Sequence, residues 1–196
     1  MRIERGYTLV EVLMVVVIIG IGFSIAVPSF QGMQERNRLV TQTNDFVAAV
    51  GLARSEANRR GGPVTLMAAV GTSGNEFGGG YCIVAGSIED ASPPTDCSGT
   101  VIRRFNALVG DSTLAGLDND ADGGDWDAPR NAITFNSLGG LDESANDGQM
   151  RYLDLCHPNQ LDRRFQIRLI GRIKVWREAE PGTPSGDIPS IQPNCS

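Results

Sequence analysis

The chain has 196 residues and a formal net charge of −6, with 17 basic residues against 23 acidic ones. This length fits one domain of ordinary size plus a shorter segment. The acidic balance argues against a protein that binds nucleic acid through its overall charge, so any such contact has to come from a local basic segment.

The first predicted element is a long apolar helix near the start of the chain. Residues 7–27 are about twenty nearly uninterrupted apolar residues, enough for a helix of ~1.5 Å rise per residue to cross a bilayer. A signal peptide does not explain this run, which is too long and ends in only a weak cleavage site at residues 26–29. Glu11 interrupts it, and a carboxylate inside a membrane costs about 2.5 kcal/mol or more without a partner. Glu11 is therefore a candidate functional residue.

Helical spacing continues beyond the apolar run. Arg59 and Arg60 suit the last turn of a helix, and the sequence Gly61-Gly62-Pro63 suits its end. We therefore predict one nearly continuous helix that ends at Arg60. Apolar residues at intervals of three and four predict a face that packs on a domain: Leu39, Val40, Phe46, Val47, Val50, Ala53 and Ala57.

After Pro63 the pattern changes to short β-prone runs separated by turn residues, with a possible turn at Ile170-Gly171. The predicted fold class is α+β: a long N-terminal helix, transmembrane in its first half, packed on an antiparallel β-sheet domain. Residues 178–196 contain four prolines and are predicted to form an extended strap. The predicted strands lie in residues 64–67, 81–84, 101–105, 132–135, 150–153 and 165–175.

The chain has four cysteines, an even number, and the predicted membrane segment would place the part of the chain after it outside the cytoplasm, where disulfides persist. Three pairings are open. We favour Cys82 with Cys97, closing a short loop, and Cys156 with Cys195, tying down the tail. Zinc is disfavoured because the chain has no C-x-x-C pair and one histidine.

The N-terminal residues resemble the class III signal of type IV pilins and type II secretion pseudopilins. The resemblance lies in Gly6, the stretch Tyr7-Thr8-Leu9-Val10-Glu11, the apolar run and Pro28. It implies that a prepilin peptidase cuts between Gly6 and Tyr7, and that Tyr7 is then N-methylated. It also implies that Glu11 pairs with the N-terminal amine of a neighbouring subunit during assembly, and that Pro28 kinks the helix. Tyr7 stands where the family usually has Phe.

Later landmarks resemble the GspH/FimT family of minor pilins and pseudopilins, in the order in which that family has them. The resemblance implies the pilin fold with a leader at 1–6, a transmembrane assembly helix at 7–30 and its amphipathic continuation at 31–62. A β-rich domain at 63–177 and the strap at 178–196 follow. The landmarks are Asn37-Arg38-Leu39, Ala53-Arg54-Ser55-Glu56-Ala57, Arg60-Gly61, Pro63-Val64-Thr65-Leu66, Ile133 to Gly139, Leu155-Cys156 and Gly171-Arg172-Ile173-Lys174.

The function implied by this resemblance is structural. A minor pilin or pseudopilin of this kind helps to assemble, prime or cap a type IV pilus or a type II secretion pseudopilus. Its implied partners are other major and minor pilins or pseudopilins, the prepilin peptidase and the inner-membrane assembly platform. Its implied location is the bacterial inner membrane, crossed once, with the globular domain in the periplasm. A major structural pilin is disfavoured because the domain resembles the minor branch.

A basic segment near the C-terminus supports a second hypothesis, a DNA-binding minor pilin that acts as a receptor in DNA uptake. Arg168, Arg172 and Lys174 fall on even positions and apolar residues on odd ones, which predicts a basic outer face. In competence-related members of the family, a Gly-Arg-x-Arg segment near the C-terminus is implicated in DNA binding. The corresponding segment of this chain is Gly171-Arg172-Ile173-Lys174. Lys174 keeps a phosphate contact but lacks the arginine fork. The alternative is a solvated strand face.

Neither catalysis nor a cofactor is indicated. The chain has no G-x-S-x-G elbow and no P-loop, so we expect no enzyme. Residues 118–123 copy the first half of a calcium loop, but its twelfth position is Pro129 instead of Glu. We favour a mobile acidic loop here and assign no metal, but a loose calcium site is the alternative. Its ligands would be Asp118, Asp120, Asp122 and Asp125.

Overall fold

The computed structural model describes residues 8–69, 75–88, 97, 99–117, 131–145, 150–157 and 161–177. The chain divides into two compact units, residues 1–41 and residues 42–196.

One helix, α1 (Leu9–Arg60), contributes to both units. Its end follows the predicted pattern: Gly61 adopts a positive φ of 65°, and its N–H donates to the carbonyl oxygens of Ala57 and Asn58. Glu56 accepts hydrogen bonds from Arg59 and Arg60 at 2.6 and 2.9 Å, and these bonds lower the pKa of its carboxyl group. Basic residues in the last turn also favour the negative end of the helix dipole.

The part of α1 in the second unit buries one face in the domain core. Phe46, Val50, Ala53 and Ala57 are buried, as their spacing predicts, and so is Ala49. Val40, which lies in the first unit, was wrongly placed on this face, because its side chain is 45% exposed.

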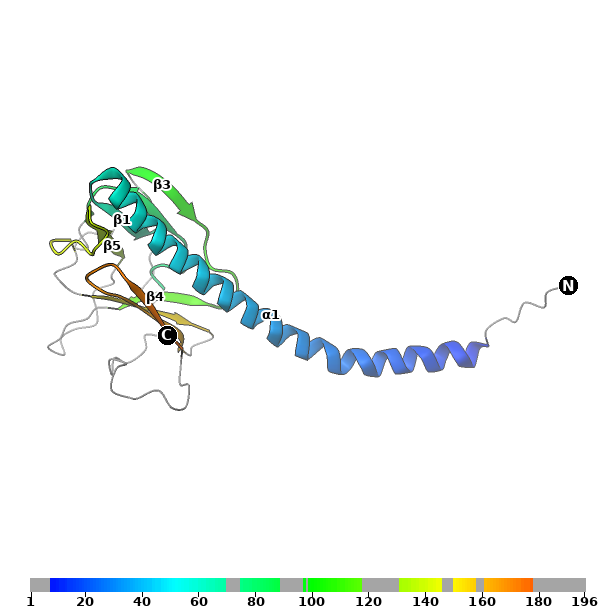
Figure 1. The fold of residues 1–196 in the computed structure, drawn as a ribbon. Helices are drawn as coiled ribbons and strands as arrows, with labels where there is room; N and C mark the ends of the chain where they lie inside the picture. Colours follow the sequence, from blue (N-terminus) through cyan, green and yellow to red (C-terminus); the bar gives the residue numbers. More distant parts are fainter. Residues whose placement is uncertain are drawn as a thin grey trace. The chain divides into compact units, whose positions relative to one another are not determined.

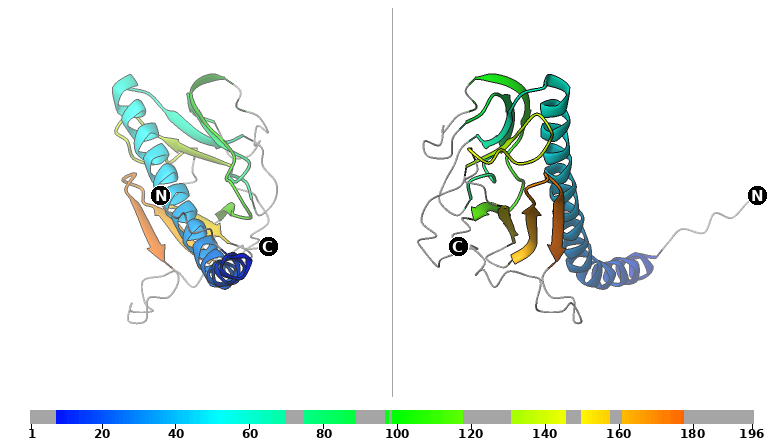
Figure 2. Two further views of the ribbon diagram at one scale, coloured as in Figure 1. Left: turned by 90° about the vertical axis from the view of Figure 1, so that its right-hand side faces the viewer. Right: turned by 60° about the vertical axis from the view of Figure 1, so that its left-hand side comes forward.

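Within the described residues, the strands form two antiparallel four-stranded sheets. Figure 1 shows where several of these strands lie beside α1. The first has the order β3-β2-β1-β5 and the second the order β4-β6-β7-β8. Figure 2 shows the cyan part of α1 lying along the strands. The predicted fold class, a helix on antiparallel sheet, is confirmed. The strands are β1 (Val64–Ala68), β2 (Tyr81–Ala85), β3 (Thr100–Phe105), β4 (Thr113–Leu117), β5 (Ala132–Phe135), β6 (Arg151–Cys156), β7 (Leu161–Ile167) and β8 (Ile173–Arg177).

Aromatic side chains join the helix to both sheets. The Phe46 ring lies 5.6 Å from the Tyr81 ring of β2 and 4.9 Å from the Phe165 ring of β7, measured between centroids. Burial raises the pKa of the Tyr81 hydroxyl, and the nearby Asp45 carboxylate raises it further. Phe46 itself is 1% exposed, so one helical side chain anchors both layers of the core.

Two strand assignments differ from the sequence prediction. The β-prone run over residues 165–175 forms a hairpin of β7 and β8, and its turn at residues 168–172 contains the possible turn predicted at Ile170-Gly171. Leu169, predicted on the inner face, lies in this turn and is 43% exposed. The second difference is β4, which the β-prone pattern did not predict.

The disulfide Cys82–Cys97 is present, as expected, and closes a loop of sequence separation 15. It packs with Met67, Val84 and Ala132 in a buried cluster. Cys156 is also disulfide-bonded. Cys195 lies outside the described residues, so its pairing with Cys156 stays a prediction.

Candidate functional site

The N-terminal end of α1 places Glu11 in the first turn. The Glu11 backbone N–H donates to the Thr8 side-chain oxygen at 3.3 Å, so Thr8 caps the helix. The spacing Thr8-x-x-Glu11 is that of a capping box, a signal that our sequence interpretation missed. An acidic side chain in the first turn also suits the positive end of the helix dipole. The cap therefore fixes where the helix starts relative to the carboxylate.

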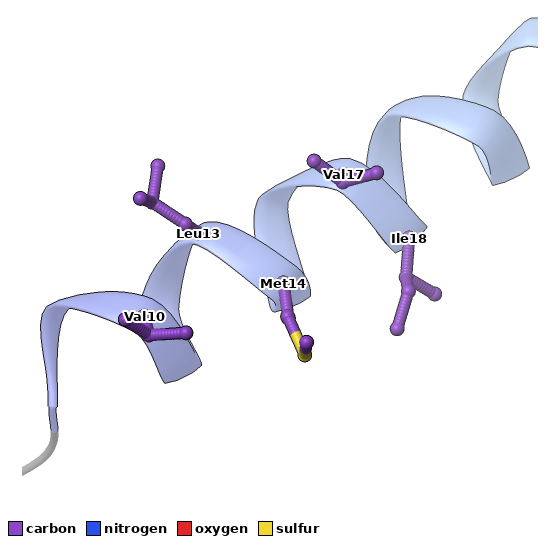
Figure 3. Close-up of a pocket in the computed structure, with 5 residues that line it drawn as sticks. All are labelled: Val10, Leu13, Met14, Val17 and Ile18. Carbon is purple, nitrogen blue, oxygen red and sulfur yellow. The ribbon is translucent and has the colours of Figure 1, made fainter.

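The side chains after Glu11 form a continuous apolar surface. Figure 3 shows five of them on successive turns of the helix, at the intervals of three and four that define one face. All five are exposed, between 56% and 68%, and such apolar exposure marks a surface suited to association. These residues are Val10, Leu13, Met14, Val17 and Ile18. Among the residues that the structure describes, no helix has both the length and the apolar content needed to cross a membrane.

Three of the predicted processing and assembly features are not tested by the geometry. Gly6 and Tyr7, the residues on either side of the predicted cleavage site, lie outside the described residues. The helix continues through position 28, but the Pro28 side chain is not described. Cleavage, N-methylation and the kink at Pro28 therefore remain predictions.

The three candidate DNA-binding residues lie on the β7–β8 hairpin. The Arg168 N–H donates to the Arg172 carbonyl oxygen at 2.9 Å, so these two residues face each other across the turn. Arg172 and Lys174 lie two residues apart and therefore share a face. All three side chains are exposed, and none forms an ion pair with the described part of the chain. The hairpin thus brings the predicted basic residues together.

The three predicted residues are exposed, but the basic run to which they belong, residues 163–177, is not exposed throughout. The side chain of Arg164 in this run is buried, and it donates to both carboxylate oxygens of Asp154 at 2.6 Å. The ammonium group of Lys174 lies 3.2 Å from the centre of the Trp176 ring, a cation–π contact. At the turn end of the hairpin, the guanidinium groups of Arg168 and Arg172 are exposed and form no ion pair with the described residues.

Three of the family landmarks, far apart in sequence, meet at one place in the second unit. The Arg54 side chain donates from Nε to the Gly139 carbonyl oxygen at 2.9 Å and from Nη2 to the Ile170 carbonyl oxygen at 3.4 Å. Gly171 has a positive φ of 74°, and a Cβ there would collide with the Gly139 carbonyl oxygen. Arg54 thus ties α1 to two turns, residues 136–141 and 168–172, that lie side by side.

We expect Gly171→Ala to lower the free energy of unfolding by about 2–4 kcal/mol, since it adds this collision to the ~1–2 kcal/mol cost of a left-handed conformation. Gly61→Ala is the matched control, because Gly61 has a φ of 65° and no atom within 4 Å of its Cβ position. Urea unfolding of both variants measures the difference. Equal losses for the two substitutions would show that the contact at Gly171 contributes nothing.

A metal site finds no support among the described residues, which contain no group of three or more His, Cys, Asp or Glu placed to hold an ion. The acidic stretch considered for calcium, residues 118–125, lies outside them.

A long N-terminal helix with an exposed apolar start, packed at its other end on antiparallel sheet, defines a protein of the type IV pilin class. The family model of the type II transport protein GspH matches residues 42–171. The prokaryotic N-terminal methylation motif matches residues 1–27. The chain belongs to the GspH family and is a minor pilin or pseudopilin of the GspH/FimT type.

Comparison with solved structures found a crystal structure that shares the fold. A crystal structure of the type IV minor pilin FimU from Pseudomonas aeruginosa aligns with a TM-score of 0.50 and 20% identity, covering 74% of this chain and 92% of FimU. The minor pseudopilin EpsH from the Type 2 Secretion System of Vibrio cholerae aligns with a TM-score of 0.46 and 14% identity, covering 75% of this chain and 99% of EpsH. No curated protein matches the sequence.

Proposed function

We propose that this minor subunit helps to assemble, prime or cap a type IV pilus or a type II secretion pseudopilus. The observation that carries the proposal is the presence of two matches in one chain: the methylation motif over residues 1–27 and the GspH family over residues 42–171. The first supplies an assembly helix with exposed apolar side chains, and the second supplies the domain that this helix carries. The role is structural, without catalysis.

The proposed division of labour follows the chain. Residues 1–6 are the leader, and residues 7–30 anchor the subunit once across the inner membrane before they pack in the filament. Residues 31–62 continue this helix into the periplasm, where residues 63–177 form the globular domain and residues 178–196 the strap. The prepilin peptidase, other pilins and the inner-membrane assembly platform are the proposed partners.

Processing tests this proposal directly. We expect the mature wild-type chain to begin at Tyr7 and to carry one added methyl group on its amine, as intact-mass spectrometry would show. Gly6→Val should leave most of the chain uncut, because a branched side chain replaces the glycine at the cleavage site. Gly22→Val is the matched control, since the same change is made at a helical position with open space around it. Normal cleavage of the Gly6 variant would contradict the proposed signal.

A second candidate function, DNA contact during DNA uptake, is favoured by one observation. Arg168, Arg172 and Lys174 are all exposed on one hairpin, with the two arginines paired across its turn. Guanidinium and ammonium groups in such a cluster bind phosphates, and each contact makes affinity depend on salt. The acidic net charge of −6 opposes strong binding, so the contact would be weak and local.

Salt dependence tests this second candidate. If the hairpin binds DNA, residues 36–196 should bind double-stranded DNA at low salt and lose affinity steeply towards physiological salt. The variant with Arg172→Ala and Lys174→Ala should lower the slope of log K against log salt by about 2, one unit for each lost phosphate contact. A variant with Arg59→Ala and Arg60→Ala removes the same charge elsewhere and is the control. Absence of binding at either salt would exclude a DNA receptor.

A further inference from the structure

Exposed apolar side chains gather at one corner of the globular domain. In the described part of residues 42–177, four large hydrophobic side chains are exposed: Val109, Leu138, Leu169 and Ile170. Leu138 is 86% exposed and Ile170 63%. Three of the four lie on the two adjoining turns that Arg54 ties together. We call Leu138, Leu169 and Ile170 the apolar corner.

The two turns that carry the apolar corner are held by hydrogen bonds. The Leu141 N–H donates to the Leu169 carbonyl oxygen at 2.7 Å, which joins one turn to the other. Within the first turn, the Asn136 side-chain oxygen accepts from the N–H groups of Leu138 and Gly140 at 3.0 and 3.1 Å. Arg54 adds its bonds to both turns from the helix. The corner is therefore presented on a fixed backbone, which lowers the entropy cost of docking.

Positive charge borders the apolar corner. Arg168 and Arg172 precede and follow Leu169 and Ile170 in the turn, and both guanidinium groups are exposed. A surface of this kind, with aliphatic side chains beside arginines, complements one that is apolar and carries carboxylates.

The opposite end of the helical segment carries the complementary chemistry. Val109, the fourth exposed hydrophobic residue, accepts a hydrogen bond at its carbonyl oxygen from the Gln42 side chain at 3.0 Å. Asp111 is exposed two residues further on, and Asp45 is exposed one helical turn from Gln42. Gln42 and Arg54 are twelve residues apart, which is ~18 Å along a helix. The domain thus has an apolar, basic corner at one end, and at the other an edge with two exposed aspartates and one exposed valine.

Such a pair of unlike ends suits a filament. Head-to-tail contacts between unlike surfaces generate open helical assemblies, whereas a self-complementary surface closes into a dimer. A neighbouring subunit of the same fold would offer its own acidic edge to this corner.

We propose that the apolar corner, bordered by Arg168 and Arg172, docks on an apolar edge that carries carboxylates in the next pilin-class subunit of the filament. This inference rests on the proposed function, because it requires that the subunit enters a filament. The aliphatic character of the corner favours a protein partner over DNA, since DNA interfaces are polar and strongly basic, whereas this corner exposes three aliphatic side chains.

Site-specific photo-crosslinking of the full chain, expressed with its own filament system, tests the docking. A photoreactive amino acid replaces Leu138 or Ile170, and the matched control replaces the exposed Thr100 of β3. These substitutions keep the backbone hydrogen bonds of both turns. We expect positions 138 and 170 to crosslink to another pilin-class subunit, at a peptide that mass spectrometry identifies as apolar with an adjacent Asp or Glu. Position 100 should give no such product.

Charge reversal provides a second measurement. Arg168→Glu with Arg172→Glu should lower the crosslink yield from position 138 several-fold, while Arg168→Lys with Arg172→Lys should retain it. Formation of the Cys82–Cys97 disulfide in both double variants shows that the globular domain still folds.

The outcomes separate this inference from the proposed function. A subunit that is present in purified filaments but gives no pilin crosslink, or that crosslinks to DNA, overturns the docking alone. A subunit that is processed but absent from filaments overturns the proposed function and the docking with it. Crosslink yields unaffected by charge reversal would show that the arginines do not select the partner.

Discussion

We expect Asp154→Ala to lower the free energy of unfolding by about 3–5 kcal/mol, because it removes one side of a buried, doubly hydrogen-bonded ion pair with Arg164. Asp154 is 0% exposed and Arg164 2%, so water does not replace the lost carboxylate. The two hydrogen bonds between them are both 2.6 Å long and use both carboxylate oxygens. The pair also joins β6 to β7, where Asp154 lies opposite Arg164 in the ladder.

Urea unfolding of the full chain in mild detergent, followed by tryptophan fluorescence, measures this loss. Glu143→Ala is the matched control, because it removes an exposed carboxylate and should change stability by less than about 0.5 kcal/mol. The double variant Asp154→Leu with Arg164→Met removes both charges and should regain much of the stability that the single variant loses. A loss below about 1 kcal/mol for Asp154→Ala would show that Arg164 finds another counter-charge or water.

Local patterns in the sequence predict the helix and most strands of this fold. The end of α1 follows from Gly61 and the two arginines before it, and the strands β1, β2, β3 and β5 follow from β-branched and aromatic runs. These elements can be predicted from short stretches of sequence, because each residue type has its own preference for helix, strand or turn.

The strand β4 was not predictable in this way, because long-range contacts define it. Its residues include Ala115 and Gly116, which have low β propensity. Two side chains from a distant loop satisfy its backbone: the Asn75 oxygen accepts from the Leu114 N–H and a Glu76 carboxylate oxygen from the Gly116 N–H, each at 2.9 Å. Its other edge pairs with β6. The residues next to β4 in the sequence give no indication that Asn75, Glu76 and β6 are its partners.

In the candidate site too, local patterns predicted some features, and others depend on long-range contacts. Alternation correctly placed Arg172 and Lys174 on one face of the hairpin, since the period of a strand is fixed. It gave no indication that Arg164, in the same basic run, is buried against Asp154, because burial depends on what covers the sheet. Likewise, Arg54, Gly139 and Gly171 stood out only as separate landmarks, and their meeting is a product of topology.

We expect Glu11→Ala to leave the protein in the membrane but to reduce its incorporation into filaments at least about tenfold, because the amine of the neighbouring subunit would then lie in an apolar medium without its counter-charge, at a cost of ~2.5 kcal/mol or more. The proposed partner is the methylated amine of Tyr7 in a neighbouring subunit. Alanine keeps the backbone N–H that donates to Thr8, so the helix cap survives. The substitution therefore tests the carboxylate rather than the helix start.

Comparison of the membrane fraction with sheared filaments, by immunoblotting for the subunit, measures this effect. Glu11→Gln has nearly the same shape without the charge and should fail like alanine, whereas Thr8→Ala removes the cap at a cost of about 1 kcal/mol and should leave incorporation nearly intact. If the glutamine variant assembled normally while alanine did not, the side chain would act by hydrogen bonding or shape. Normal incorporation of both variants would disprove the charge pair, and the apolar face of Figure 3 would then have to set the register of the packed helices without it.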